Sequence, residues 1–284
     1  MKFREKLEKN KFVFTLEVEP PKGVDIETTL KEVLPLKKYI DAFNVTDMQS
    51  ANMRLSSWAL AAKLKLNNLE PILQLTTRDR NCLALQGDLL GSYALGVENL
   101  LLLTGDRPIC GDHPKAKEVF EVDSLGLIKI ASQLNSGYDL SGNLLKGKPN
   151  FYIGAALNPM AKDVDRELKR AEKKIKLGAS FFQTQPIFDV KKFYVFMKKI
   201  RRLRTKVIAG VIFLKSHKMA KYLNENVEGI EVPHLYLDRL EKAKNKKEEA
   251  IRIAKEIIAE LKDICQGVHI MSLGWYSTAR ELFL

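Results

Sequence analysis

In this 284-residue chain, short apolar runs are repeatedly followed by polar or charged side chains. One such run-end is typical of a loop start, but a series containing carboxylates and amides indicates a shared polar pocket. Carboxyls suit proton transfer, and primary amides, which donate and accept, suit reading the edge of a heterocyclic ring. The run-ends are Glu17 and Glu19, Thr46 and Asp47, Gln74, Thr76 and Thr77, Gly105 and Asp106, Asn158, Gln183 and Gln185, and Gly274 with Trp275.

Glu17 is the first candidate for acid–base chemistry. It follows the apolar run Phe12–Leu16 and precedes Pro20 and Pro21. A carboxyl held among apolar groups has its charged form disfavoured by desolvation, which suits a proton donor near neutral pH. Side chains alternate along a strand, so Glu19 points the same way as Glu17 and the spacing does not choose between them. A surface acid that ends the strand is the simpler alternative.

The segment Thr104-Gly105-Asp106 follows the most apolar run of the chain, Asn99–Leu103. A glycine lets a ligand approach the backbone closely, and Asp106 places a negative charge beside it. From the spacing alone, a simple Gly-Asp turn is the preferred interpretation.

The histidines and cysteines argue against a metal centre, because neither set has ligand spacing. An odd and sparse cysteine count favours reduced thiols in a cytoplasmic protein. The charged N-terminus resembles no signal segment, and the apolar runs fall short of the roughly 20 residues of a membrane span. The residues concerned are His113, His217, His234, His269, Cys82, Cys110 and Cys265.

The net charge of +12 is concentrated in Lys191–Lys206, which holds eight cations and no acid. A solvated helix face is the first interpretation, and an anionic small ligand or an acidic partner is the next. Nucleic acid comes last, because no recognisable module or interleaved aromatic side chains accompany the charge.

A repeated strand-then-helix order must position these polar ends. Eight such units favour an α/β fold, a single-domain (β/α)8 TIM barrel over 1–284 with its site at the carboxyl ends of the strands. A doubly wound open sheet is the rival, but no G-x-G-x-x-G follows any strand. The expected strands are Phe12–Val18, Ala42–Thr46, Pro71–Thr76, Asn99–Leu103, Phe151–Ala156, Ser180–Thr184, Lys206–Ile212 and Val268–Leu273. The expected helices are Asp25–Tyr39, Ser56 or Ser57 to Leu66, Asn81–Leu95, Asp123 or Ser124 to Leu134, Asp163–Leu177, Asp189–Arg202, Ser216–Asn224, Leu237–Cys265 and Tyr276–Leu284. Pro35 is expected to kink or end the regular part of the first of these.

In this order, the strand ends resemble those of the methylenetetrahydrofolate reductase family, which are flavin-dependent (β/α)8 barrels, over nearly the whole chain. The motif Glu-Pro-Pro-Lys-Gly at residues 19–23 is most similar to that of the family branch found in anaerobic bacteria and fused to homocysteine methyltransferases. The segments that carry the resemblance are Leu16–Pro21, Asn44–Asp47, Leu73–Asn81, Leu103–Pro108, Gly154–Pro159 and Thr184–Asp189.

The resemblance implies a cytoplasmic oxidoreductase of one-carbon metabolism and methionine biosynthesis. It would reduce 5,10-methylenetetrahydrofolate to 5-methyltetrahydrofolate with hydride from the N5 atom of a reduced flavin, FAD or alternatively FMN. Glu17 matches the family's general acid, and Asp106 matches the aspartate beside the flavin and the pterin. Gln185 matches the folate-binding glutamine, with Gln183 and Glu19 next to it. The flavin-contacting positions are Thr46, Gln74, Thr104, Gly105, Asp106, Ala156, Asn158 and Lys174.

Some positions depart from the enteric enzymes: Gln74 replaces a histidine, Thr104 replaces an arginine, and Gly274-Trp275 stands where a C-terminal arginine is expected. These departures leave the electron donor open between NAD(P)H and a zinc or iron–sulfur partner subunit. We expect a homo-oligomer or hetero-complex, and a basic Lys198–Arg204 rim that favours polyglutamyl folates. The alternative function is a non-reducing pterin- or folate-binding barrel that serves as a methyltransferase partner subunit.

Overall fold

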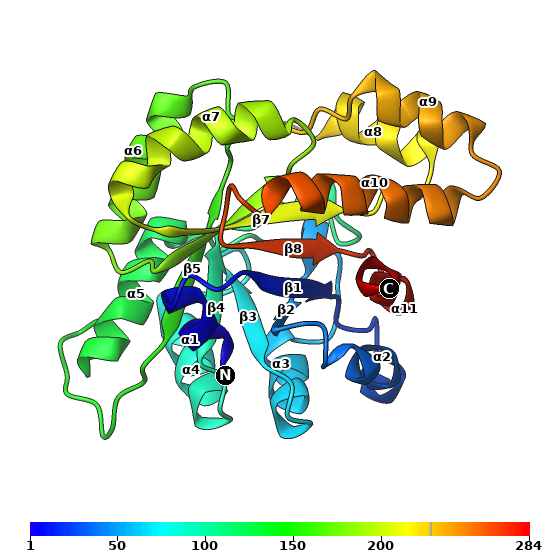
Figure 1. Ribbon diagram of the computed structural model, residues 1–284. Helices are drawn as coiled ribbons and strands as arrows, with labels where there is room; N and C mark the ends of the chain where they lie inside the picture. The colour runs from blue at the N-terminus through cyan, green and yellow to red at the C-terminus, as the bar shows by residue number, and fades with distance from the viewer. Residues whose placement is uncertain (228) are drawn as a thin grey trace.

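The computed structural model, which describes residues 1–227 and 229–284, contains a closed barrel of eight parallel strands in the order β1 to β8 (Figure 1). The (β/α)8 barrel predicted from the sequence is confirmed. The strands are β1 (Val13–Val18), β2 (Ala42–Val45), β3 (Pro71–Thr76), β4 (Asn99–Leu103), β5 (Tyr152–Leu157), β6 (Phe181–Pro186), β7 (Lys206–Ile212) and β8 (Gly267–Met271).

An apolar layer fills the amino-terminal end of the barrel. It consists of inward-facing side chains from seven strands, among them the stacked rings of Tyr152 and Phe181. The helix α1 (Phe3–Glu8), which the sequence analysis did not predict, closes this end by inserting Phe3 and Leu7. The layer members are Val13, Ala42, Ile72, Leu101, Tyr152, Phe181 and Ile208. Because this end is sealed by packing, the open end lies where the strands finish.

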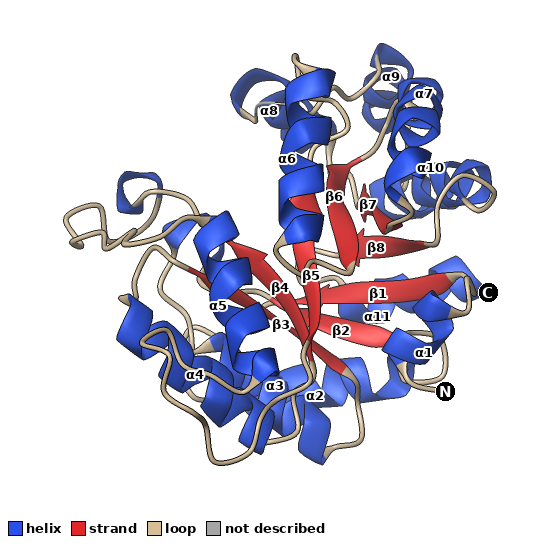
Figure 2. Cartoon of the chain, turned by 90° about the vertical axis from the view of Figure 1, so that its left-hand side faces the viewer, coloured by secondary structure: helices blue, strands red, loops and turns tan. Residues whose placement is uncertain are grey.

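Helices surround the strands on the outside, as Figure 2 shows. Several begin at a side chain that accepts a backbone N–H of the first turn, as at Asp123, Asp163 and Asp189. The helices are α2 (Ile26–Val33), α3 (Ser57–Leu66), α4 (Cys82–Ala94), α5 (Ser124–Ser136), α6 (Val164–Lys176), α7 (Val190–Ile200), α8 (His217–Asn226), α9 (His234–Lys242), α10 (Lys246–Leu261) and α11 (Tyr276–Ala279).

Three expected helices are shorter in the structure. As expected from Pro35, which lacks the N–H that would continue the helix, regular helix α2 stops at Val33 and a 3-10 turn follows over Leu34–Leu36. The expected helix Leu237–Cys265 is divided into α9 and α10, since Ala243 is extended and Asn245 caps a new helix. The closing helix ends at Ala279 and continues as a 3-10 turn.

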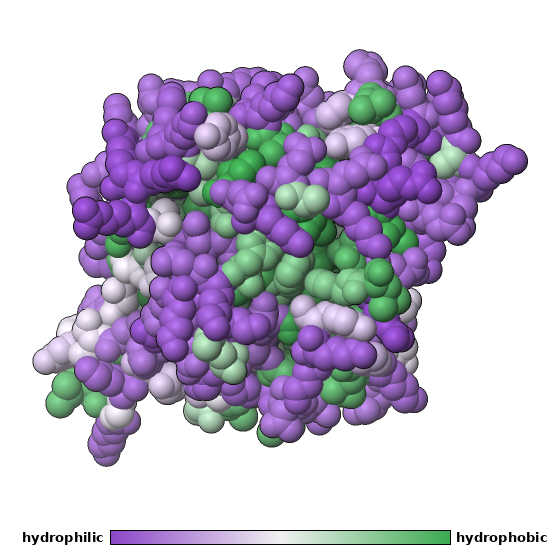
Figure 3. All heavy atoms as spheres, viewed as in Figure 1, coloured by the Kyte–Doolittle hydropathy of each residue, from purple (hydrophilic) through white to green (hydrophobic). Residues whose placement is uncertain are grey.

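The surface is dominated by polar and charged side chains on the face shown in Figure 3, where apolar residues gather only in limited areas. Within residues 1–227 and 229–284, no helix combines the length and the apolar character that crossing a membrane requires.

Candidate functional site

The interior of the barrel changes from apolar to polar two residues beyond the sealed layer. Alternation along each strand turns Thr15, Asn44, Gln74 and Gln183 toward the barrel axis. Gln74 Nε2 donates to Asn44 Oδ1 at 2.8 Å, and Asn44 Nδ2 donates to Gln183 Oε1 at 2.6 Å. This chain of amides joins β3, β2 and β6 across the interior, a space that branched apolar side chains usually fill in such barrels. Asn44 was missed as a site residue, because only strand ends were considered.

Glu17 lies deep in this polar interior and is only 5% exposed. Among the described residues its Oε1 atom has no hydrogen-bond partner. Its Oε2 atom lies 3.8 Å from Nε2 of His269, which is too long for a direct hydrogen bond. The carboxyl therefore lies at the barrel axis without a hydrogen bond from any described side chain to its Oε1 atom.

His269 is a site residue that the sequence analysis missed, because histidines were inspected only for metal-ligand spacing. It is fully buried in β8, and its Nδ1 atom lies 2.9 Å from Thr15 Oγ1. The parallel register of β1 and β8 pairs these two residues directly. Its Nε2 atom has no hydrogen-bond partner within the described part of the chain. The signal available in the sequence was a histidine inside the otherwise apolar last strand, two residues after Gly267.

Glu19, which the spacing did not distinguish from Glu17, has a different environment. Its side chain is 26% exposed, and its Oε2 atom accepts from Arg54 at 3.1 Å. Burial and the neighbouring Glu17 raise the pKa of Glu19, while Arg54 and Lys215 lower it in part. Glu19 is thus an ion-paired acid at the rim, whereas Glu17 lies inside the barrel, 3.8 Å from His269 and without a hydrogen bond to its Oε1 atom from any described residue.

Asp47 is a buried acid with a supporting role. Its carboxylate accepts from Arg80 at 2.8 and 3.1 Å, from the backbone and hydroxyl of Thr76, and from Ser57. Burial lowers the pKa of Arg80, but Asp47 and Asp88 outweigh it and raise the pKa overall. The network ties the ends of β2 and β3 to α3, and it leaves the carboxylate of Asp47 fully used.

The segment after β4 forms part of the rim. Gly105 has a φ of +89°, and a Cβ atom there would approach Thr76 Cβ to 3.0 Å. A side chain there would therefore be strained by the backbone conformation and would require Thr76 to shift. The carboxylate of Asp106 is exposed, and its backbone carbonyl accepts from Arg78 Nη1 at 3.3 Å. The hydroxyl of Thr104 accepts from the Ser124 N–H at 3.1 Å.

The other flavin-contact candidates occupy two places. Thr46 is buried, and its hydroxyl lacks a partner among the residues described. Lys174, on α6, donates from Nζ to the carbonyl of Ala156 at 2.6 Å, and burial lowers the pKa of Lys174 to about 8. Asn158, in contrast, uses its Oδ1 atom to accept from the Met160 N–H and lines a separate cavity beside α6.

Gln183 and Gln185 lie at different depths of β6. Gln183 is buried in the amide chain, whereas Gln185 is exposed at the rim. The Thr184 hydroxyl donates to the carbonyl of Gln185 at 2.6 Å and accepts from the Gly210 N–H at 2.9 Å. The side chain of Gln185 is thus presented at the mouth by a held backbone. In the part of the chain that is described, no group of three or more His, Cys, Asp and Glu is arranged to hold a metal ion.

The closed parallel barrel, sealed at one end and polar at the other, defines the class of (β/α)8 proteins whose strand ends carry the functional residues. The model of the methylenetetrahydrofolate reductase family matches residues 2–282. The chain belongs to that family, and the resemblance seen in the sequence is confirmed.

Individual relatives are distant. Methylenetetrahydrofolate reductase 2 of Schizosaccharomyces pombe is 23% identical over 172 residues, which cover 58% of this chain and 26% of the yeast protein. An uncharacterized protein from Clostridium thermocellum that binds two copies of 5-methyl-5,6,7,8-tetrahydrofolic acid has a TM-score of 0.69 at 16% identity, over 97% of this chain and 96% of that one. Oxaloacetate acetylhydrolase, with a TM-score of 0.56 and 12% identity, covers 99% of this chain and 81% of its own. At these identities, the solved structures show a shared fold alone.

Proposed function

We propose that the protein reduces 5,10-methylenetetrahydrofolate to 5-methyltetrahydrofolate with a bound flavin. The observation that carries the proposal is Glu17, a buried carboxyl at the barrel axis whose Oε1 atom is unpartnered among the described residues. Family membership over residues 2–282 supports the reaction class. The Clostridium thermocellum neighbour binds 5-methyltetrahydrofolic acid, which is the product of this reaction.

The residues present fit a flavin. The Thr46 hydroxyl is buried without a partner in the described structure, and Gly105, with a φ of +89°, gives the rim after β4 a backbone conformation that few other residues adopt. Thr46, Gly105 and Asp106, with Gln74, Ala156 and Lys174, would hold the cofactor, which we propose to be FAD rather than FMN. When bound and reduced, the flavin supplies the hydride.

Glu17 acts in this proposal as the general acid. It gives its proton to N10 of the substrate as the bond between N10 and the methylene carbon breaks, which leaves a cationic iminium at N5. In this proposal His269, whose Nε2 atom lies 3.8 Å from the carboxyl and whose Nδ1 atom contacts Thr15, returns a proton to Glu17 between turnovers.

The polar rim has two further tasks. The exposed carboxylate of Asp106 carries a negative charge that stabilises the cation electrostatically. Gln183 and Gln185 bind the pterin through their amides, and Asn44 orients Gln183 by donating to its Oε1 atom. Glu19, which is paired with Arg54, shapes the rim rather than moving the proton.

The experiment starts from the visible spectrum of the purified protein, followed by anaerobic addition of NADH or NADPH. Bound-flavin absorbance that bleaches with either nucleotide, and returns on addition of 5,10-methylenetetrahydrofolate, supports the proposal. Absorbance that bleaches only with an added reductant such as dithionite assigns the donor role to a partner subunit. A protein that binds folate but purifies colourless and takes up neither FAD nor FMN contradicts the proposal in favour of the non-reducing folate-binding barrel.

Glu17→Gln and Glu19→Gln form a matched pair, because the two acids lie two residues apart on the same strand. We expect Glu17→Gln to lose folate turnover while it keeps flavin binding and flavin reduction, and Glu19→Gln to keep all three. If Glu19→Gln alone lost turnover, the acid would be Glu19 instead.

A further inference from the structure

The connection after β4 is unusually long and is held to other loops of the barrel mouth. It covers residues 104–123, between β4 and α5, and its middle part, residues 107–119, is called the strap below. Connections longer than about 12–15 residues without regular structure of their own are uncommon in compact domains, and many of them are functional. This connection is fixed by hydrogen bonds at both arms and at its tip, so its path is determined by specific side chains.

Arg78, in the loop after β3, holds the two arms of the strap and is only 2% exposed. Its Nη1 atom donates to the carbonyl of Asp106 at 3.3 Å, and its own carbonyl accepts the Val119 N–H at 2.8 Å. Arg107 and Glu118 pair with each other across the strap, with Nε 3.0 Å from Oε2. The strap is therefore a closed loop that begins directly after Asp106.

Asp112, at the tip of the strap, is bonded to the loops after β1 and β2. Its Oδ2 atom accepts from Lys22 Nζ at 2.5 Å, and its Oδ1 atom accepts from the Met53 N–H at 2.9 Å. The Nδ1 atom of His113 lies 2.7 Å from the same Oδ1 atom. Lys22, His113 and the Met53 N–H hold the pKa of Asp112 well below its usual range, so the carboxylate is charged at neutral pH.

The tip of the strap also packs backbone against backbone on the loop after β2. A Cβ atom on Gly111 would lie 1.9 Å from the carbonyl oxygen of Ala51, so a side chain there would force one of the two backbones to move. Met48, Ser50 and Ala51 have φ angles of +47°, +53° and +57°. Non-glycine residues in this region cost about 1–3 kcal/mol each, and they persist where surrounding contacts fix them. The contact with Asp112 and Gly111 is one that fixes this loop.

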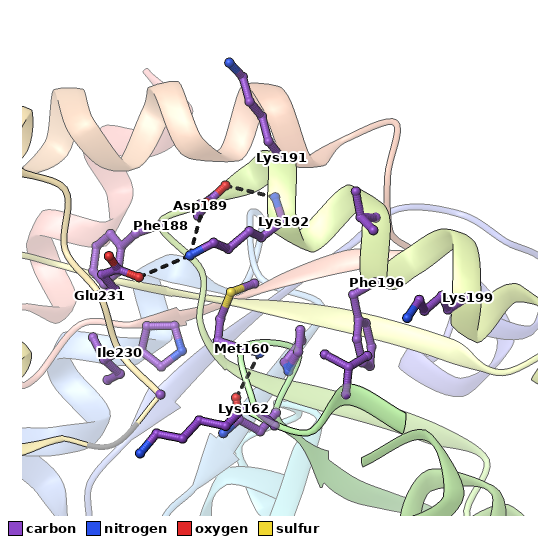
Figure 4. Close-up of a pocket in the computed structure, with 17 residues that line it drawn as sticks. Met160, Lys162, Phe188, Asp189, Lys191, Lys192, Phe196, Lys199, Ile230 and Glu231 are labelled. Atoms are coloured by element: carbon purple, nitrogen blue, oxygen red, sulfur yellow. Dashed lines mark hydrogen bonds and ion pairs between the residues drawn. The ribbon is translucent and has the colours of Figure 1, made fainter. Parts of the chain in front are cut away.

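The contacts of Asp112 differ from those of an acid that caps a helix. Asp189 accepts the Lys192 N–H at 2.9 Å at the start of α7 and lies 3.8 Å from Lys192 Nζ. Figure 4 shows these local contacts beside the cavity that Asp189 lines. Asp112, in contrast, bonds to residues that are 90 and 59 positions away in the sequence. It therefore ties loops together rather than starting a helix.

The loops that Asp112 ties together follow the strands that carry two acids of the proposed mechanism. Glu17 lies in β1, and the loop after β1 is joined to the loop after β2 by the Leu55 N–H, which donates to the carbonyl of Pro21 at 2.9 Å. Asp106 lies beyond the end of β4. Strand pairing links β1 to β4 only through β2 and β3, and it does not extend to Asp106. The strap and Asp112 supply a second link between the two ends.

We infer that Asp112 is a positioning residue that fixes the place of Asp106 relative to Glu17, an inference that rests on the proposed function. Glu17 gives a proton to the substrate and Asp106 stabilises the cation that results, so both must meet one bound molecule. Asp112 touches neither substrate nor flavin and acts through the backbone of the strap. A misplacement of about 1 Å in such a pair costs up to about a hundredfold in rate.

The test compares Asp112→Ala, Asp106→Asn and the double variant Asp106→Asn/Asp112→Ala. A negative charge beside the flavin disfavours its reduction, so we expect the reduction potential of the flavin, measured by spectroscopic titration, to rise in both single variants. The double variant has the potential of Asp106→Asn alone, because Asp112 acts only through Asp106. An unchanged potential in Asp112→Ala, or additive shifts in the double variant, overturns the inference.

The kinetics of the same proteins give a second measurement. We expect Asp112→Ala to slow folate reduction about tenfold without slowing flavin reduction by the donor. Glu118→Gln is the matched control, because it removes a carboxylate of the same strap whose partner, Arg107, is 71% exposed. It should change neither the rate nor the potential appreciably. An equal loss in Glu118→Gln would show that the tie at Asp112 has no special role.

Trypsin cleavage of the flavin-free protein tests the tie without any catalysis, since the strap contains Lys115 and Lys117. We expect cleavage at these lysines to be about tenfold faster in Asp112→Ala and unchanged in Glu118→Gln, because local opening of the strap exposes them. Unchanged cleavage in Asp112→Ala overturns the inference, whatever the protein reduces. A wild-type protein that binds no flavin and reduces no folate refutes the proposed function instead, and faster cleavage would still establish the tie.

Discussion

Replacing Glu17 tests whether this acid is held for function at the expense of stability. Its Oε1 atom is buried without a hydrogen bond among the described residues, and a buried unsatisfied polar group costs about 1–3 kcal/mol. Glu17 also raises the pKa of Glu19, so the two carboxylates repel each other. Glu17→Gln removes the charge but keeps a polar amide, and Glu17→Met removes both. We expect the free energy of unfolding to rise by about 1 kcal/mol for Gln and about 2 kcal/mol for Met.

Urea unfolding of the flavin-free protein at pH 7.5, followed by circular dichroism, measures the effect. Each kcal/mol corresponds to a rise in Tm of about 2 °C for a chain of this length. Glu19→Gln is the control, because it breaks a partly exposed ion pair with Arg54 and should change stability by less than about 1 kcal/mol in the destabilising direction. A loss of stability by 1 kcal/mol or more in both Glu17 variants would refute the reasoning, since the carboxyl would then be a structural group.

Three further outcomes follow from the buried polar groups. Burial lowers the pKa of Lys174 to about 8, below the ordinary 10.5. Between these two pH values the unfolded chain keeps a proton on Lys174 that the folded chain has released. The free energy of unfolding should therefore rise as the pH goes from 8 to 10.5. Lys174→Met should lack this rise, so that the difference in unfolding free energy between the two proteins changes by about 3 kcal/mol over that range; a pH-independent difference would contradict it. Asp47→Asn should cost about 1.5–3 kcal/mol in urea unfolding because the buried Arg80 loses one of its two carboxylate partners and keeps only Asp88, and a cost below 1 kcal/mol would show that the pair with Asp47 is dispensable. His269→Gln, which can still bond to Thr15, should slow folate reduction about tenfold and alter its pH profile without slowing flavin reduction by the donor. An equal slowing of both half-reactions would assign His269 a structural role.

The order of strands and helices could be predicted because its signals are local. Apolar runs such as Asn99–Leu103 and caps such as Asp189 depend on neighbours within a few residues, and the structure places both as expected. The break between α9 and α10 was missed because the Lys- and Glu-rich sequence around Asn245 is compatible with continued helix. Helix α1 was missed because its apolar residues, Phe3 and Leu7, are stabilised by a barrel end formed by distant strands.

The roles of the two acids and of the basic run were decided by tertiary structure. Strand alternation places Glu17 and Glu19 on the same side, but only the closed barrel buries one and pairs the other with Arg54. Packing of α7 likewise turns Lys199 into the cavity and Lys198 away from it.

The chain by itself therefore determined the barrel, its polar mouth and its family, because these depend on spacing along the strands and at their ends. Only the closed ring brought Thr15 to His269, a contact across 254 residues of sequence, and joined Asn44 to Gln183 across the interior. Such contacts depend on the register between the first strand and the last, and no local pattern sets that register.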